Sequence, residues 1–121
     1  MPIRHLIIIA AAVAAAGLLI TAAQAQGNPT TSNNPSYGSG LLHYCSEPPA
    51  SMNGRFCEGY IYGVVMADQD SGLTCARPIP SSQMVLIVRE YLDANPSQLH
   101  LLSNELVTAA MKRVYPCRVS R

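Results

Sequence analysis

The 121-residue chain contains no tryptophan, a single phenylalanine and few charged residues, which make up 12% of the sequence. It also lacks the HExxH, GxSxG, CxxC and phosphate-loop motifs, which mark common zinc hydrolases, serine hydrolases, thiol redox proteins and nucleotide-binding proteins. The formal net charge is only +1 and no basic patch is visible, which argues against a nucleic acid as the partner. We therefore expect no enzyme activity, no cofactor and no metal.

An apolar, alanine-rich run occupies residues 6–23 and follows Arg4 and His5. It leads into Ala23, Gln24 and Ala25, the small-x-small pattern that signal peptidase cleaves after. Residues 1–25 are thus predicted to be a signal peptide that directs the chain to the periplasm. A membrane anchor is the alternative, because the run is nearly long enough to span a bilayer. After cleavage we expect no membrane association.

The next segment, QGNPTTSNNPSYGSG at residues 26–40, is polar and has no aliphatic side chain. Such a composition cannot bury enough apolar surface to order itself, so residues 26–40, Gly38 and Gly40 included, are predicted to form a flexible linker. Residues 41–121 remain as one small domain. Seven of the eight Lys and Arg lie after residue 25, against seven Asp and Glu, so the exported chain is close to neutral.

The apolar pattern of the domain predicts an all-α fold of about four helices stacked as antiparallel hairpins. A short helix is expected at 41–46, before Pro48 and Pro49, and a second at 53–70, which Ser71 and Gly72 end. A third begins near Ser81 and stops by Asn95. The sequence NPSQ at 95–98 is typical of a capped helix start, so the last helix is predicted to begin there and to continue to about residue 114.

Four cysteines, all in this domain, are too widely spaced for a zinc site and, in an exported chain, indicate two disulfides. The helical stretch between Cys57 and Cys75 is about 20 Å long, so these two cysteines cannot bond to each other. If successive helices run up and down, Cys45 lies beside Cys57 at one end and Cys75 beside Cys117 at the other. We therefore predict the bridges Cys45–Cys57 and Cys75–Cys117.

Gly59, Gly63 and Ala67 place small residues four positions apart on the second helix. Glycine destabilises a helix interior by about 0.5–1 kcal/mol relative to alanine, so another backbone is expected to approach this groove closely. Packing against the last helix and the seam of a homodimer are the two alternatives. Tyr62 and Val65 are candidate partner-binding residues, because this helix is apolar nearly all round.

Asp68 and Asp70 lie together at the end of the same helix, before the loop at 71–80. They are either solvated loop residues or part of a partner-binding surface, since a catalytic role would need a cleft that perturbs them. We include both as candidate partner-binding residues because the segment from Asp68 to Pro80, held by Cys75, is the loop most able to protrude.

Three stretches in this order resemble the type VI secretion amidase immunity proteins of the Tai and Rap type: FCEGYIYGVVMADQ, CARPIPSSQMVLIVREYLDANPSQLH and LVTAAMKRVYPC. The resemblance covers nearly all of the exported domain. The positions that carry it are Gly59, Tyr60, Gly63, Val64, Cys75, Pro78, Tyr91, Leu92, Pro96, His100, Pro116 and Cys117.

The resemblance implies a small helical periplasmic protein, often a homodimer, that binds a peptidoglycan amidase toxin and blocks its active-site cleft sterically. An inhibitor of this kind needs no catalytic residue. Two other functions remain open: an acid-stress chaperone of the periplasm, which would loosen at low pH, and a structural or regulatory envelope protein with no toxin partner.

Overall fold

The computed structural model describes residues 33–76 and 78–118, and within these ranges the chain forms four α-helices and one 3-10 helix. The expected signal peptide, residues 1–25, and residues 26–32 of the expected linker lie outside the described part. The elements in chain order are α1 (Gly38–Cys45), α2 (Met52–Asp70), α3 (Ser81–Ala94), η2 (Pro96–Gln98) and α4 (Ser103–Val114). The all-α fold of about four helices is confirmed.

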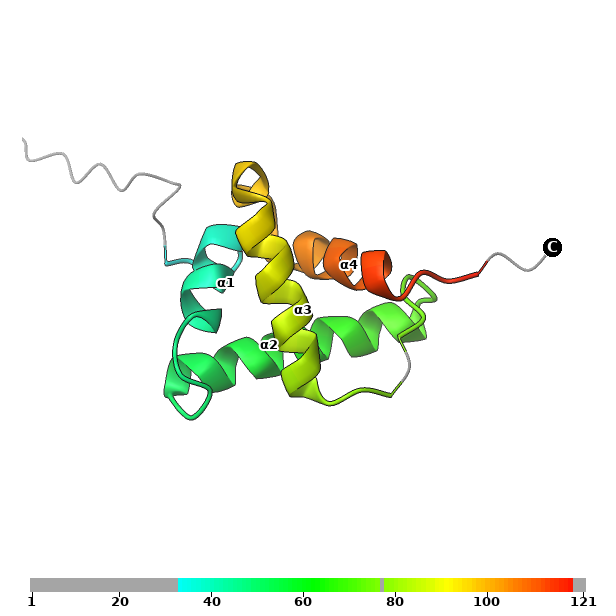
Figure 1. The fold of residues 1–121 in the computed structure, drawn as a ribbon, viewed down its shortest axis with the longest axis horizontal. Coiled ribbons are helices and arrows are strands. Elements are labelled where there is room, and N and C mark those ends of the chain that lie inside the picture. The colour runs from blue at the N-terminus through cyan, green and yellow to red at the C-terminus, as the bar shows by residue number, and fades with distance from the viewer. Residues whose placement is uncertain (1–32, 77, 119–121) are drawn as a thin grey trace, which may run out of the picture.

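The helices cross one another instead of stacking as antiparallel hairpins. Figure 1 shows α3 lying across α2 and α4, with α1 at one end of α2. Each of the four helices contacts the other three. The expectation of an up-and-down hairpin stack is therefore wrong in its geometry, although the order of the helices is right. Within the described ranges no helix is long and apolar enough to cross a membrane.

One apolar core is shared by all four helices. Its fully buried side chains have the helical spacing that the sequence pattern predicts for α2, α3 and α4. They are Leu41 from α1, Ile61 and Val65 from α2, Met84, Val88 and Leu92 from α3, and Leu106, Val107 and Met111 from α4.

The two disulfides join the predicted cysteines. Cys45, the last residue of α1, is bonded to Cys57 in α2, and Cys75, between α2 and α3, is bonded to Cys117 after α4. Both pairings are confirmed. The argument for them needed only which helix ends lie together, and the crossed arrangement keeps those ends together.

The start of α1 belongs to the folded domain and not to the linker. The backbone N–H of Gly38 donates to the carbonyl oxygen of Leu101 at 3.0 Å, and that of Ser39 donates to the carbonyl oxygen of Leu99 at 2.9 Å. Gly38 and Gly40 are both buried. The assignment of residues 33–40 to a flexible linker is therefore wrong, because carbonyl groups from the far end of the chain hold this segment.

Helix α4 starts later than the sequence predicted. The sequence predicted a helix from Asn95 onward, but residues 96–98 form only the 3-10 turn η2, and α4 begins at Ser103. Gln98 does not cap a helix; its Oε1 accepts a hydrogen bond from the Tyr91 hydroxyl at 3.1 Å. Leu102 is extended, with ψ of 139°, and pairs with Tyr37 in an isolated β-bridge, so no helix runs through from residue 95.

Candidate binding surface

Helix α2 has one face in the core and one face in solvent. It begins after Ser51, whose side-chain oxygen accepts a hydrogen bond from the Gly54 N–H at 3.0 Å, so Ser51 is the cap and the helix starts at Met52, one residue before the predicted start at 53. Cys57, Ile61 and Val65 follow at intervals of four and are buried. The opposite face of the helix is exposed and forms the candidate surface.

The candidate groove of small residues lies on this exposed face. A Cβ atom added at Gly59 or at Gly63 would meet no atom within 4 Å, and Ala67 is exposed as well. Close packing of Gly59, Gly63 and Ala67 against the last helix of the domain is therefore wrong. The alternative, a homodimer seam, stays a prediction.

The four candidate partner-binding residues have different environments. Tyr62 is 48% exposed, and Asp70 is exposed at the end of α2. Val65 is fully buried in the core, so its proposed role at an interface is wrong. Asp68 is also buried, and it accepts a hydrogen bond from the Thr108 hydroxyl at 2.6 Å. Its interpretation as a surface residue is therefore wrong, because its carboxylate joins α2 to α4.

The loop after α2 is held close to the helix end at several points. The Leu73 N–H donates to the carbonyl oxygen of Asp68 at 2.7 Å, and the Gln69 side-chain amide donates to the carbonyl oxygen of Ala76 at 3.0 Å. Gly72 has a φ of 70°, which only glycine adopts without strain in this turn. The disulfide Cys75–Cys117 attaches the same loop to the end of α4.

Three hollows follow one another along the crossing of α2 and α3. The first, of about 280 Å³, is lined by the Cys45–Cys57 disulfide and by side chains that include Glu58 and Leu86. The second contains Arg55, Glu58 and Tyr62, and the third runs from Tyr62 towards Ile79. Since neighbouring hollows share Glu58 and Tyr62, they make a continuous uneven surface rather than separate sites.

Aromatic side chains border this surface on the α1 side of α2. The rings of Tyr44 and Phe56 have centroids 4.9 Å apart, and those of Phe56 and Tyr60 are stacked at 6.1 Å. Burial raises the pKa of the Tyr60 hydroxyl above 10.0, and a hydrogen bond with Ser103 lowers it in part. The row joins α1 to α2 while leaving Phe56 40% exposed.

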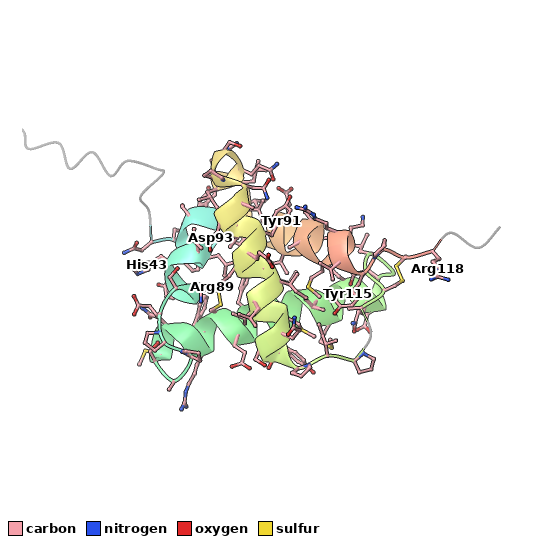
Figure 2. The ribbon with its side chains drawn as sticks, in the orientation of Figure 1. His43, Arg89, Tyr91, Asp93, Tyr115 and Arg118 are labelled. Atoms are coloured by element: carbon pink, nitrogen blue, oxygen red, sulfur yellow. A yellow bond between two sulfur atoms is a disulfide. The ribbon has the colours of Figure 1, made fainter. Side chains whose placement is uncertain are left out.

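The sequence interpretation missed Arg89 and gave no weight to Leu86. Both lie on α3 at the first hollow, where Leu86 is 57% exposed. Figure 2 shows Arg89 on the side of α3 that faces α1. The sequence does place an apolar Leu86 three residues before Arg89 on the polar face of α3, and this spacing puts the two side chains close together. It did not show that the end of α1 lies beside this pair.

This surface is uneven and has charged side chains of both signs. Among residues 33–76 and 78–118, no group of three or more His, Cys, Asp or Glu is placed to hold a metal ion. The fold and surface thus define a small helical domain, fastened by two disulfides, whose exposed groups suit contact with another molecule. Two disulfides are typical of proteins that fold outside the reducing cytoplasm.

Comparison with known protein families shows which family this domain belongs to. Residues 37–117 match the family model of the Rap1a immunity proteins, and the chain therefore belongs to the Rap1a immunity protein family. The matched range begins at the contact between Tyr37 and Leu102 and ends at the second disulfide, so it coincides with the folded domain. No curated protein and no solved structure matches the chain.

Proposed function

We propose that the protein is a periplasmic immunity protein that binds a peptidoglycan amidase toxin, delivered by type VI secretion, and sterically occludes its active site. The observation that carries this proposal is the family match over residues 37–117. An immunity protein protects the cell by binding a cognate toxin, and the amidase class follows from the resemblance in sequence.

Two features of the domain support a steric mechanism. The exposed surface along α2 and α3 combines apolar side chains, such as Tyr62 and Leu86, with charged groups of both signs. Interfaces of this composition bind through a few well-packed side chains surrounded by polar contacts. The disulfides hold the helices in place before binding, which lowers the entropy cost of forming a complex.

The proposed location of action is the periplasm, where the substrate of such an amidase lies. The apolar run at 6–23 with its cleavage pattern supports export, and the two disulfides fit an oxidising compartment. A homodimer is proposed as the state in which the exposed Gly59–Gly63 face is covered. The proposal includes no cofactor, metal or nucleic acid.

The test is inhibition of a peptidoglycan amidase, and the first candidate is any amidase with a Cys and His dyad that a neighbouring gene is found to encode. Full chain, exported and with its disulfides formed, is titrated into the purified amidase while released peptidoglycan fragments are measured by liquid chromatography. We expect hydrolysis to stop at a fixed stoichiometric ratio. A second test expresses the same amidase in the periplasm of two strains. Cells that produce the complete chain should survive, and cells that produce the chain without residues 1–25 should die.

A result with no complex and undiminished hydrolysis would reject the immunity function. In that case the two remaining functions are separated by acid treatment: a chaperone suppresses aggregation of unfolded client proteins at low pH, and a structural envelope protein does not. A chain that is cytoplasmic and protective without export would reject the periplasmic location alone.

A further inference from the structure

A cavity of about 280 Å³ lies between the end of α1, the start of α2 and α3. Its walls are mostly apolar and include the Cys45–Cys57 disulfide, Val85 and Leu86. This volume is just below the range of small-molecule sites, so the cavity has room for one or two side chains and not for a cofactor.

Arg89 supplies an unsatisfied donor at this cavity. No residue of the described ranges forms an ion pair with its guanidinium; the Nε atom is closed to solvent and has no hydrogen-bond partner, so a ligand in the cavity reaches the guanidinium at its terminal nitrogens. A buried N–H group without an acceptor destabilises the protein, and a guanidinium binds a carboxylate with particularly good geometry. The cavity therefore combines an apolar interior with a group that lacks an oxygen acceptor.

The other charged residues at the cavity limit the charge that a ligand can carry. Glu58 already accepts a hydrogen bond from the hydroxyl of Ser81, and Glu47 also lines the cavity. These two carboxylates repel a compact anion of high charge, such as phosphate or sulfate. A single carboxylate carries half the charge of such an anion, so the repulsion is smaller and its pairing with Arg89 opposes what remains.

We propose that this cavity is an anchor site for the cognate toxin, which inserts an apolar side chain while a neighbouring Asp or Glu carboxylate of the toxin pairs with Arg89. Leu86, which is 57% exposed beside the cavity, is covered in the complex and excludes water from the charged pair. The inference rests on the proposed immunity function and adds to it the chemistry of the contact.

The first experiment uses two probes that differ only in the acidic group, the capped dipeptides acetyl-Leu-Asp-amide and acetyl-Leu-Asn-amide. Each is titrated into the oxidised full chain while amide chemical shifts are recorded by NMR. The aspartate probe should shift the amides of Ser82, Val85 and Leu86. It should bind about tenfold more tightly than the asparagine probe, because only a carboxylate forms a charge-assisted pair with Arg89.

Arg89→Gln keeps the side-chain stem as far as Cδ and a polar end while it removes the charge, and it should abolish the difference between the probes. Lys112→Gln, which removes an exposed cation from α4, is the matched control and should preserve the difference. Equal affinities for both probes in the unmodified chain, or shifts confined to other surfaces, would overturn the inference. Tighter binding of decanoate at the same amides would assign the cavity to a lipid instead, and shifts that follow protein concentration would assign it to a second copy of the chain.

The second experiment measures the affinity for the amidase itself. Arg89→Gln should weaken binding about tenfold, and Lys112→Gln should leave it unchanged. If the unmodified chain binds and Arg89→Gln binds equally well, the anchor site is wrong while the immunity function stands. If the unmodified chain does not bind, both are wrong.

Discussion

The carboxylate of Asp68 accepts a hydrogen bond from the hydroxyl of Thr108 at 2.6 Å, which joins the last turns of α2 to the middle of α4. Asp68 is 7% exposed, and its backbone carbonyl oxygen also accepts the Leu73 N–H. This residue therefore fixes both the packing of two helices and the start of the following loop.

Asp68→Ala should lower the free energy of unfolding by about 1–3 kcal/mol, because it removes the acceptor of a buried hydrogen bond. Asp70→Ala is the matched control: it lies on the same turn but is exposed, so its effect should stay within about 0.5 kcal/mol. Urea denaturation followed by circular dichroism measures both. Equal effects of the two substitutions would show that Asp68 has no structural role beyond its charge.

Two glycines of α2 should respond in opposite directions to alanine. A Cβ atom at Gly54 would lie 2.8 Å from the Cα atom of Pro49, so Gly54→Ala should destabilise the protein by about 1–3 kcal/mol through overpacking. No atom lies within 4 Å of a Cβ at Gly59, so Gly59→Ala should stabilise it by about 0.5–1 kcal/mol. The test is to measure the thermal unfolding temperatures of both variants beside that of the unmodified chain. A lower temperature for Gly59→Ala would contradict the open environment of that residue.

The homodimer prediction can be tested at Gly63. If a second copy covers the exposed face of α2, then Gly63→Leu should convert the dimer to a monomer, because the added side chain would separate the two backbones. Light scattering coupled to size-exclusion chromatography measures the mass. Gln83→Leu places the same side chain on an exposed position of α3 and serves as the control. If the unmodified chain is a monomer, or if the dimer persists in Gly63→Leu, the prediction of a homodimer seam on this face is wrong.

The disulfides close loops of different length, with sequence separations of 12 for Cys45–Cys57 and 42 for Cys75–Cys117. Chain entropy predicts losses of about 3 and about 4 kcal/mol when each is removed. Replacing Cys75 and Cys117 together by alanine should also loosen the loop around residue 75 without unfolding the core, because the hydrogen bonds at Leu73 and Ala76 keep the loop against α2 while its covalent link to the end of α4 is lost. Amide hydrogen exchange tests this prediction: in the double variant, exchange should become faster around residue 75 and stay unchanged in α3. Equally faster exchange in both regions would contradict the prediction.

Alkaline pH should destabilise the protein through Tyr60. The pKa of its hydroxyl is raised above 10.0 in the folded state, so the folded protein keeps this proton at a pH where the unfolded chain has lost it. The stability that the neutral Tyr60 hydroxyl contributes is complete below pH 10 and is lost as the pH rises through the raised value. Urea denaturation between about pH 9 and pH 11 should show a smaller decline for Tyr60→Phe than for the unmodified chain. Identical declines would exclude this contribution.

The sequence determined much of the fold because its signals are local. The apolar pattern predicted the number and order of the helices but not the core face of α2, where Val65 points inward; the breaks at Pro48, Gly72 and Asn95 marked helix ends close to where they occur. Helix length alone excluded a Cys57–Cys75 bond, and chain order paired the remaining cysteines correctly. The helix breaks depend on neighbours within one or two turns, whereas the cysteine pairing needed in addition only the order of the helices and the ends that they share.

The tertiary structure decided what depends on partners far along the chain. Residues 33–40 are ordered because the first N–H groups of α1 donate to the carbonyl oxygens of residues 99 and 101, and α4 starts late because Leu102 is extended beside Tyr37. Asp68 is buried since Thr108 faces it, whereas Gly59 is exposed since no helix covers it. The cavity beside Arg89 likewise exists only where the ends of α1 and α2 meet α3. No local pattern encodes these contacts, because residues brought together by helix crossing leave no periodic signal in the sequence.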